Sequence, residues 1–241
     1  MRTVVKSALL AAAVATIASL QGSRAIAADK QGAPKVPAKN ELAIDRGRTA
    51  VLIMDYENQI LGMLPEKTQA AVLDNASAIL KEARLVHLPI IYVVVRFRDG
   101  YPEVSRQNKR FAGLKESGRL REGTPGAEIH ARVAPQPVDI VVTKRRVGAF
   151  STTDLESILR ANNISTLALF GISTSGVVLS TVRWAADMDY QLVVVSDASA
   201  DMDDEVHRVL TEKVFPWQAT VVSTHEFVKA LAAKPAQGGN R

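Results

Sequence analysis

The sequence predicts an α/β protein built on a mainly parallel, doubly wound sheet of about six strands. Short runs rich in Val, Ile and Leu alternate along the chain with segments of helical periodicity. These runs are apolar almost throughout, which is typical of strands that are buried on both faces. The chain has 241 residues, 47% of them hydrophobic, and this is enough apolar material for one sizeable core.

The expected strands and helices follow one another from residue 49 onward. The strands are expected at 49–54, 90–95, 139–143, 166–170, 191–196 and 219–223. Helices are expected at about 68–86, at 152–163, after the turn at 171–176, at about 203–214 and after the last strand. Thr153 and Glu156 have the spacing of a capping box, so we expect the helix at 152–163 to begin with one.

The first residues have the pattern of an export signal. Arg2 and Lys6 precede an apolar run at 7–20, and small residues follow up to Ala27, so residues 1–27 are expected to be a signal peptide. A membrane anchor is the alternative, but this run is shorter than the roughly 20 residues that span a bilayer. We therefore expect a periplasmic or secreted protein, with a flexible tether at 28–40, a folded domain at 41–233 and a disordered tail at 234–241.

Composition argues against several classes of function. Without the three basic residues of the signal, 27 basic and 25 acidic residues remain, and the formal net charge falls from +5 to +2. No basic stripe is interleaved with aromatic residues, so we expect no nucleic-acid partner. The sequence contains no cysteine, which rules out thiol chemistry, disulfides and thiolate metal sites. We also expect no cofactor, and no membrane contact after processing.

Candidate functional residues directly follow the expected strands, because ligands of parallel sheets bind beyond the carboxyl ends of the strands. These positions hold Asp55, Arg96, Arg98, Lys144, the turn 171–176 and Asp197. Asp55 and Lys144 could pair, with the lysine keeping the aspartate ionised for acid–base chemistry; a structural salt bridge is the alternative. The turn amides could hold a developing negative charge, or the glycines could serve only to make a tight turn.

Three segments in this order resemble a known family. They are "VLIMDYENQI", "VVTKRRVGAF" with the "TDL" that follows it, and "LFGISTSGVVLSTVRWAADMDYQLVVVSDASAD". They are similar to the signature segments of the isochorismatase-like hydrolases, also called the cysteine hydrolase family, and the resemblance spans about 49–228. It implies a three-layer α/β/α Rossmann-like fold and a small-molecule substrate. Because members of the family often assemble, we expect a homo-oligomer.

The resemblance implies a catalytic triad of Asp, Lys and Cys, of which this chain has two members. Asp55 and Lys144 match the first two, while the position of the cysteine maps to Val177. Covalent amide hydrolysis through a thiolate is therefore not expected. Isochorismatases proper also lack the cysteine and cleave a vinyl ether by protonating it, which implies that Asp55 is the general acid and that Lys144 tunes it.

Further candidates surround this position. The substrate-binding or oxyanion candidates are Ser173, Thr174, Ser175, Gly176, Phe150 and Arg96. A hydroxyl nucleophile needs a partnered base, and none of the four histidines (His87, His130, His207 and His225) is expected near the turn. The segment "RFRDGYPEVS" after the second strand lacks the histidine of the metal-binding family members, so we expect no metal.

The sequence leads to two hypotheses of function. The first is an exported isochorismatase-like hydrolase that acts on a small organic acid or amide through Asp55 and Lys144. The second is a non-catalytic descendant of the family that binds a small molecule or a protein through the same cleft. Under the first hypothesis, arginines near the strand ends could face a substrate carboxylate or could simply be exposed; these are Arg96, Arg98, Arg145 and Arg146.

Two pairs of residues are expected to have structural roles. Asp197 and Asp201 follow the fifth expected strand, where carboxylates commonly cap helices. Trp184 and Trp217 fit amphipathic positions, so we expect them to pack in the core or at a subunit contact.

Overall fold

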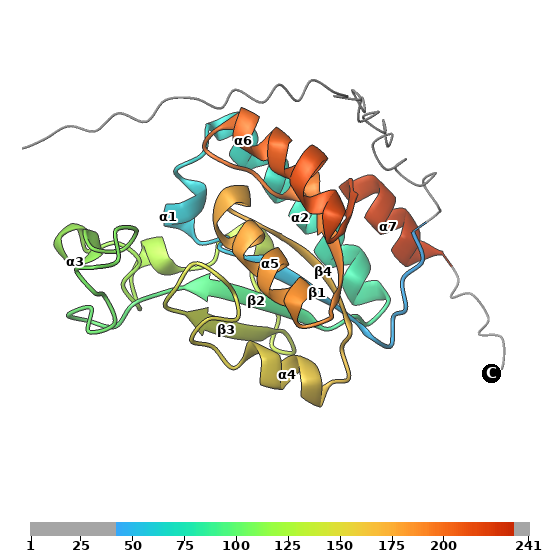
Figure 1. The fold of residues 1–241 in the computed structure, drawn as a ribbon, viewed down its shortest axis with the longest axis horizontal. Coiled ribbons are helices and arrows are strands. Elements are labelled where there is room, and N and C mark those ends of the chain that lie inside the picture. The colour runs from blue at the N-terminus through green and yellow to red at the C-terminus, as the bar shows by residue number, and fades with distance from the viewer. Residues whose placement is uncertain (1–41, 234–241) are drawn as a thin grey trace, which may run out of the picture. The chain divides into compact units, whose positions relative to one another are not determined.

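The computed structural model describes residues 42–233 and confirms the α/β fold class (Figure 1). The strands are β1 Thr49–Met54, β2 Ile90–Val95, β3 Ile140–Lys144, β4 Thr166–Gly171, β5 Gln191–Val195 and β6 Thr220–Val222. They form one sheet in the order β3-β2-β1-β4-β5-β6, and every pairing is parallel. The expected signal peptide, tether and tail lie outside the described residues.

The helices follow the strands in alternation. They are α1 Asn58–Leu61, α2 Glu66–Leu85, α3 Leu114–Ser117, α4 Leu155–Ala161, α5 Leu179–Asp187, α6 Asp204–Val209 and α7 Thr224–Ala232. A π-helical turn at Thr174–Val178 leads into α5, and another at Leu210–Val214 continues α6. Together, α6 and the second π-helical turn account for the single helix expected at 203–214.

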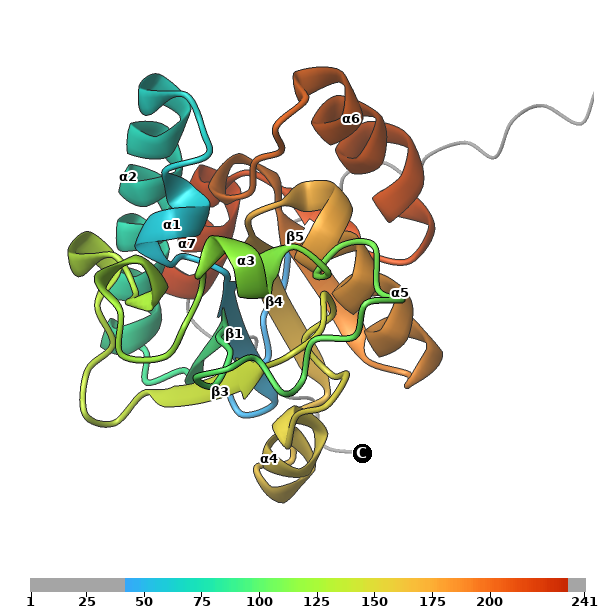
Figure 2. The ribbon, with the colours of Figure 1, turned by 90° about the vertical axis from the view of Figure 1, so that its left-hand side faces the viewer.

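The sheet is the middle of three layers. Helices α2 and α7 pack on one face, and α4 and α5 pack on the other (Figure 2). Alternate residues of each strand serve the two faces: Val51 and Ile53 contact the first layer of helices, and Leu52 and Met54 contact the second. Burial on both faces explains why the strands read as continuous apolar runs.

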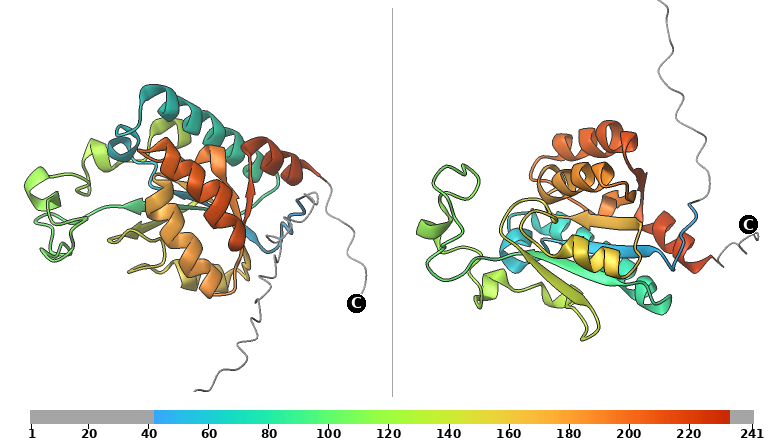
Figure 3. Two further views of the ribbon diagram at one scale, coloured as in Figure 1. Left: turned by 45° about the horizontal axis from the view of Figure 1, so that its top comes forward. Right: turned by 60° about the horizontal axis from the view of Figure 1, so that its bottom comes forward.

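The order of the strands places a switch point next to β1. From β1 the chain runs outward through β2 to β3, and it then returns to β4 on the other side of β1. Ligands bind at such a switch point, beyond the carboxyl ends of the strands. The long segment between β2 and β3, which carries α3, extends beyond these strand ends (Figures 1 and 3).

The capping box lies on a different helix from the one expected. Asp154, whose side chain makes no capping hydrogen bond, is the N-cap residue of α4, and the Thr153 hydroxyl donates to the carbonyl of Ala149 instead. The prediction of a box at Thr153 and Glu156 is therefore wrong. A complete capping box begins α7, where the side chains of Ser223 and Glu226 satisfy each other's backbone amides.

The two tryptophans do not lie in the core, because Trp184 is 50% exposed and Trp217 is 81% exposed. The expectation of core packing is wrong for both; a subunit contact is the part of that expectation that stays a prediction. Within residues 42–233, no helix combines the length and the apolar character that crossing a bilayer requires.

Candidate active site

Asp55 lies directly after β1, at the switch point of the sheet. Its backbone amide donates to the carbonyl of Val93 at 2.8 Å, and its φ of 58° is in the left-handed region. Such a conformation is uncommon for a residue other than glycine and often occurs at functional positions. The side chain is almost completely buried, so its ionisation depends on the groups around it.

Lys144 is the partner of this carboxylate. It is the last residue of β3, and its side chain is 1% exposed. The Nζ atom donates to Asp55 Oδ2 at 2.9 Å and to the carbonyl of Arg146 at 3.2 Å. The ion pair spans the end of β2, because β2 lies between β3 and β1 in the sheet. The structure thus brings together the two residues that the sequence pairs.

Two opposing effects set the acidity of Asp55. Burial raises the pKa of its carboxyl above the ordinary value, while the charges of Lys144 and Arg110 and the hydrogen bond from Lys144 lower it. Burial is the largest effect, so the net pKa is raised. Asp55 Oδ1 is buried and has no hydrogen-bond partner among the described residues. An oxygen left unpaired in this way favours the protonated carboxyl, in agreement with the direction of the pKa shift.

The position opposite the pair is apolar. Val177, in the π-helical turn before α5, is buried and lines the same pocket as Asp55 and Lys144. The turn lies against β1: a Cβ atom at Gly171 would be 2.7 Å from the carbonyl oxygen of Met54 and 3.1 Å from Val177 Cγ1. Glycine is required there for this close approach. An alkyl group thus occupies the place where the resemblance implies a thiol.

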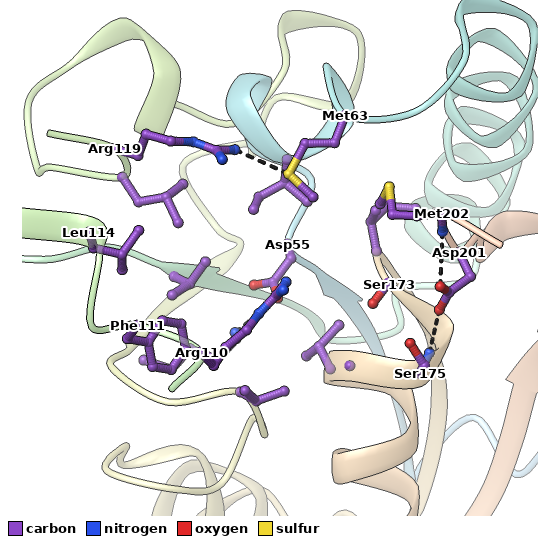
Figure 4. A pocket seen from close by; sticks show the side chains of 18 residues that line it. Asp55, Met63, Arg110, Phe111, Leu114, Arg119, Ser173, Ser175, Asp201 and Met202 are labelled. Atoms are coloured by element: carbon purple, nitrogen blue, oxygen red, sulfur yellow. Dashed lines mark hydrogen bonds and ion pairs between the residues drawn. The ribbon is translucent and has the colours of Figure 1, made fainter. Parts of the chain in front are cut away.

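The pocket between these residues has a volume of about 490 Å³. Ser173, Ser175, Gly176, Asp201 and Met202 line one side of it. Met63, Arg110, Phe111, Leu114 and Arg119 line the other side, most of them from the segment between β2 and β3. In Figure 4 the Arg110 side chain extends toward Asp55. The pocket is largely apolar, with a few charged groups directed into it.

The turn amides are partly occupied by protein groups. Ser175 N–H donates to Asp201 Oδ2 at 2.6 Å, and Gly176 N–H donates to the carbonyl of Ser173 at 3.2 Å. These two amides are therefore not free oxyanion donors. Asp201 and Asp197 have structural roles, although neither is an N-cap residue: Asp201 Oδ2 accepts the N–H of Ser175 in the π-helical turn, and Asp197 Oδ1 accepts the N–H of Thr224 at the start of α7. Asp203 is the N-cap residue of the helix that follows them, α6.

Three of the expected substrate-binding residues do not line this pocket. Phe150 lies in the core with its ring 6.0 Å from that of Tyr190, and it faces a separate hollow beside Trp184. Arg96 donates to the carbonyl of Ala127 and pairs with Glu128 instead. Thr174 is completely buried. These residues were singled out for their closeness in sequence to the motifs, which did not determine where their side chains point.

His207 lies near the turn, contrary to the expectation from the sequence. Its Nδ1 atom is 2.8 Å from the hydroxyl of Thr174, because α6 packs against the π-helical turn. Burial lowers the pKa of the His207 ring, although Asp201 and Asp204 oppose this effect. The histidine bonds a hydroxyl that is closed off from the pocket, so the contact supports the turn and does not create a nucleophile.

The other expected arginines hold the long segment in place. Arg145 pairs with Glu103 at 3.2 Å and with Glu122 at 2.5 Å, and Arg98 also pairs with Glu103. Arg146 donates to the carbonyl of Glu103. Arg98, Arg145 and Arg146 do not line the pocket.

Sequence reasoning missed three charged residues near the pair. Arg110 and Arg119 lie in a long segment without periodicity, and nothing local indicates that the segment folds back over the strand ends. Glu57, two residues after Asp55, is completely buried. Its place in the segment "DYENQI", next to the expected strand end, was the feature of the sequence that could have indicated a position near the pair. Within the described part of the chain, no group of three or more His, Asp or Glu side chains is arranged as metal ligands would be.

The fold and the site together define an α/β protein with a buried Asp–Lys ion pair at the switch point of its sheet. The chain belongs to the isochorismatase family of hydrolases, since the family model described as "Isochorismatase domain" matches residues 49–226. YwoC of Bacillus subtilis (strain 168), described as an uncharacterized isochorismatase family protein, is 33% identical over 192 residues, covering 80% of this chain and 98% of the relative.

Two other similar proteins are named for hydrolases. The ureidoacrylate amidohydrolase RutB of Stutzerimonas stutzeri (strain A1501) is 28% identical over 231 residues, covering 83% of this chain and 90% of the relative. The crystal structure of a cysteine hydrolase from Pseudomonas syringae pv. phaseolicola 1448A matches with a TM-score of 0.71 and 24% identity, covering 79% of this chain and 95% of that chain. This structural match supports the fold.

Proposed function

We propose that this protein is an exported hydrolase that acts on a small organic acid or amide through acid–base catalysis by Asp55 and Lys144, without a side-chain nucleophile. One observation carries the proposal: the buried Asp55–Lys144 ion pair lines a pocket. The side chain of Val177, which lines the same pocket, has no nucleophilic atom. A buried carboxyl with a raised pKa is suited to hold and deliver a proton near neutral pH.

The pair can perform two kinds of hydrolysis. On a vinyl ether, protonated Asp55 gives its proton to the enol carbon, water adds to the resulting oxocarbenium ion, and the water's proton returns to Asp55. The hemiketal then collapses to an alcohol and a ketone. On an amide, ionised Asp55 removes a proton from the attacking water and passes it to the leaving nitrogen. In both cases Lys144 stabilises the carboxylate form of Asp55.

Arg110 supports an acidic substrate. Among the described residues, its guanidinium has no ion-pair partner, and it lines the pocket close enough to affect the pKa of Asp55. A guanidinium binds a carboxylate through two parallel hydrogen bonds. The apolar side chains Phe111 and Leu114 line the same part of the pocket. A small, mainly apolar molecule with a carboxylate group therefore fits this pocket.

A substrate screen with matched variants tests the proposal. Vinyl ethers of hydroxy acids, ureido acids and simple amides are incubated with the wild type and with Asp55→Asn, and binding of the same compounds is measured by calorimetry. Turnover by the wild type that falls by about 10²-fold or more in Asp55→Asn supports the enzyme. Tight binding without turnover by the wild type contradicts it and favours a binding protein.

The proposal includes export and self-association. The charged start, the apolar run and the small residues before Ala28 support cleavage after Ala27. N-terminal sequencing of the protein from its source cell should then begin at Ala28, and a cytosolic chain with an intact Met1 would contradict export. The exposed Trp184 and Trp217 support a homo-oligomer, which light scattering would detect as a mass above that of one chain.

A further inference from the structure

Glu57 is a buried carboxyl that the proposed chemistry does not use. It follows Asp55 by two residues and is completely shielded from solvent. Its Oε1 atom accepts the backbone N–H of Val95 at 2.5 Å. Its Oε2 atom is also buried and has no hydrogen-bond partner among the described residues. A charged oxygen in such a place is unfavourable unless a cation or a donor compensates it.

The side-chain hydrogen bond of Glu57 leads to the strand that lies between Asp55 and Lys144. Val95 is the last residue of β2, and it is in register with Lys144 at the end of β3. Val95 also lines the pocket. By holding the amide of Val95, the Glu57 side chain ties the segment after β1 to the end of the strand over which the Asp55–Lys144 pair lies.

The cations near Glu57 are already engaged or exposed. Lys144 donates to Asp55, and Arg110 lies in the open part of the pocket. Arg96, next to Val95, donates to the carbonyl of Ala127 and pairs with Glu128. These contacts leave Glu57 without a buried cation of its own.

The segment 127–130 also packs against Glu57, which forms an isolated β-bridge with Ile129. Its titratable groups are Glu128, which faces Arg96, and His130, whose Nδ1 accepts the N–H of Arg132. Burial and the charge of Arg132 lower the pKa of His130, so this ring tends to be neutral. The segment therefore supplies no second positive charge to Glu57.

We propose that Glu57 is a positioning residue that remains a neutral carboxylic acid, holds the end of β2 through Val95, and leaves the charge of Lys144 to Asp55 alone. The two carboxyls and one buried ammonium then carry no net charge while Asp55 is ionised. A second carboxylate would compete with Asp55 for Lys144. Burial and the negative charge of Asp55 raise the pKa of Glu57 well above its ordinary value, whereas Lys144 lowers it.

Infrared spectroscopy tests the protonation state directly. A protonated carboxyl has a C=O stretch above the amide bands, and the wild type at pH 7 should show such a band that is lost in Glu57→Gln. The matched control is Glu103→Gln. Burial raises the pKa of Glu103, but the hydrogen bond from its own backbone and the contacts with Arg98 and Arg145 together lower it. That variant should leave the band unchanged. An identical band in the wild type and Glu57→Gln contradicts the proposal.

The wild type alone provides a second test, which does not depend on how well a variant folds. In protein labelled with ¹³C at the glutamate carboxyl carbons, one resonance should keep the chemical shift of a protonated acid at pH 7. A spectrum in which every glutamate is ionised at pH 7 contradicts the proposal.

The pH dependence of stability separates a neutral Glu57 from an ordinary ion pair. A carboxyl whose pKa is raised in the folded state contributes stability that is complete below the unfolded value of about 4.3 and is lost as the pH rises through the folded value. The wild type should therefore lose stability as the pH rises, and Glu57→Gln should not lose it for this reason. The free energy of unfolding of Glu57→Gln minus that of the wild type should increase with pH. For Glu103→Gln, whose wild-type carboxyl has a lowered pKa, the free energy of unfolding relative to the wild type should fall as the pH rises toward about 4.3 and should then stay constant. A loss for Glu57→Gln with rising pH contradicts the proposal.

The role in catalysis rests on the proposed function, but the protonation state does not. If no substrate is found, the infrared and stability results still decide whether Glu57 is neutral. If a substrate is found, Glu57→Gln should keep wild-type turnover within about threefold at neutral pH, because an amide oxygen can still accept the N–H of Val95. A fall in turnover as large as that of Asp55→Asn contradicts a positioning role.

Discussion

The Nζ atom of Lys144 lies 2.9 Å from Oδ2 of Asp55, although the strands that carry the two residues are separated by β2. Each side chain is nearly inaccessible to solvent. A buried pair of this kind depends on both members, because removing one leaves an uncompensated charge in the interior.

We expect Lys144→Met to lower the free energy of unfolding by about 3–5 kcal/mol, because the Asp55 carboxylate loses its cation. Asp55→Asn should also destabilise the protein, since it leaves the ammonium alone. The double variant should be more stable than the sum of the two single effects predicts, because no lone charge remains. Denaturant unfolding of all four proteins measures this coupling, and strict additivity would show that the pair does not interact.

Substitution of Val177 tests the position opposite the pair. Val177→Ala removes only methyl groups and should lower stability by about 1–3 kcal/mol while turnover persists. Both side chains are buried, but Val177 lines the pocket and Val178 does not. Val177→Cys should therefore react with small alkylating reagents, whereas Val178→Cys should not. Mass spectrometry counts the adducts. Equal labelling of the two variants, or loss of turnover in a folded Val177→Ala, would overturn the assignment of this position.

Arg110→Gln tests recognition of an acidic substrate. Loss of one guanidinium–carboxylate contact should raise KM on the order of 10-fold. The positive charge of Arg110 also lowers the pKa of Asp55, so its removal should move the limb of the pH profile that reports Asp55 to higher pH. Arg106→Gln is the control, because Arg106 is exposed in the same segment and does not line the pocket. Equal effects of the two substitutions would indicate only a change in overall charge.

The capping box of α7 makes a prediction about stability alone. Ser223→Ala should lower the free energy of unfolding by about 1 kcal/mol, because the N–H of Glu226 loses its acceptor. Glu156→Ala at the start of α4 should change the free energy of unfolding by less than about 0.5 kcal/mol. The Glu156 side chain is 43% exposed, and its ion pair with Arg160 has a length of 3.6 Å. Thermal unfolding measures the effect of each variant. A larger loss of stability in Glu156→Ala than in Ser223→Ala would instead favour the capping box that the sequence predicts at Thr153 and Glu156.

The sequence was informative where local pattern and topology coincide. Continuous apolar runs identified all six strands, and the rule that ligands bind at the carboxyl ends of parallel strands selected Asp55 and Lys144 as partners although they are 89 positions apart. The first inference depends on burial, which produces the apolar runs. The second depends on strand direction, because parallel strands all end at the same edge of the sheet.

The missed features depend on tertiary packing. Arg110 reaches the pocket because a segment without periodicity folds over the strand ends, and His207 reaches Thr174 because α6 packs on the π-helical turn. Phe150 follows a motif residue closely but turns toward Tyr190. A linear pattern contains no information about which way such side chains point, so these placements required the structure.

The ion pair between Arg145 and Glu103 affects how the pocket responds to ionic strength. Both side chains are at most 14% exposed, so dissolved ions screen their attraction only weakly. The Arg121–Asp99 pair is more exposed, with exposed fractions of 47% and 88%, and is screened strongly. Added salt therefore weakens the Arg121–Asp99 pair but leaves Glu103 bound to Arg145, the residue after β3, so the segment that forms one wall of the pocket keeps this anchor at high ionic strength.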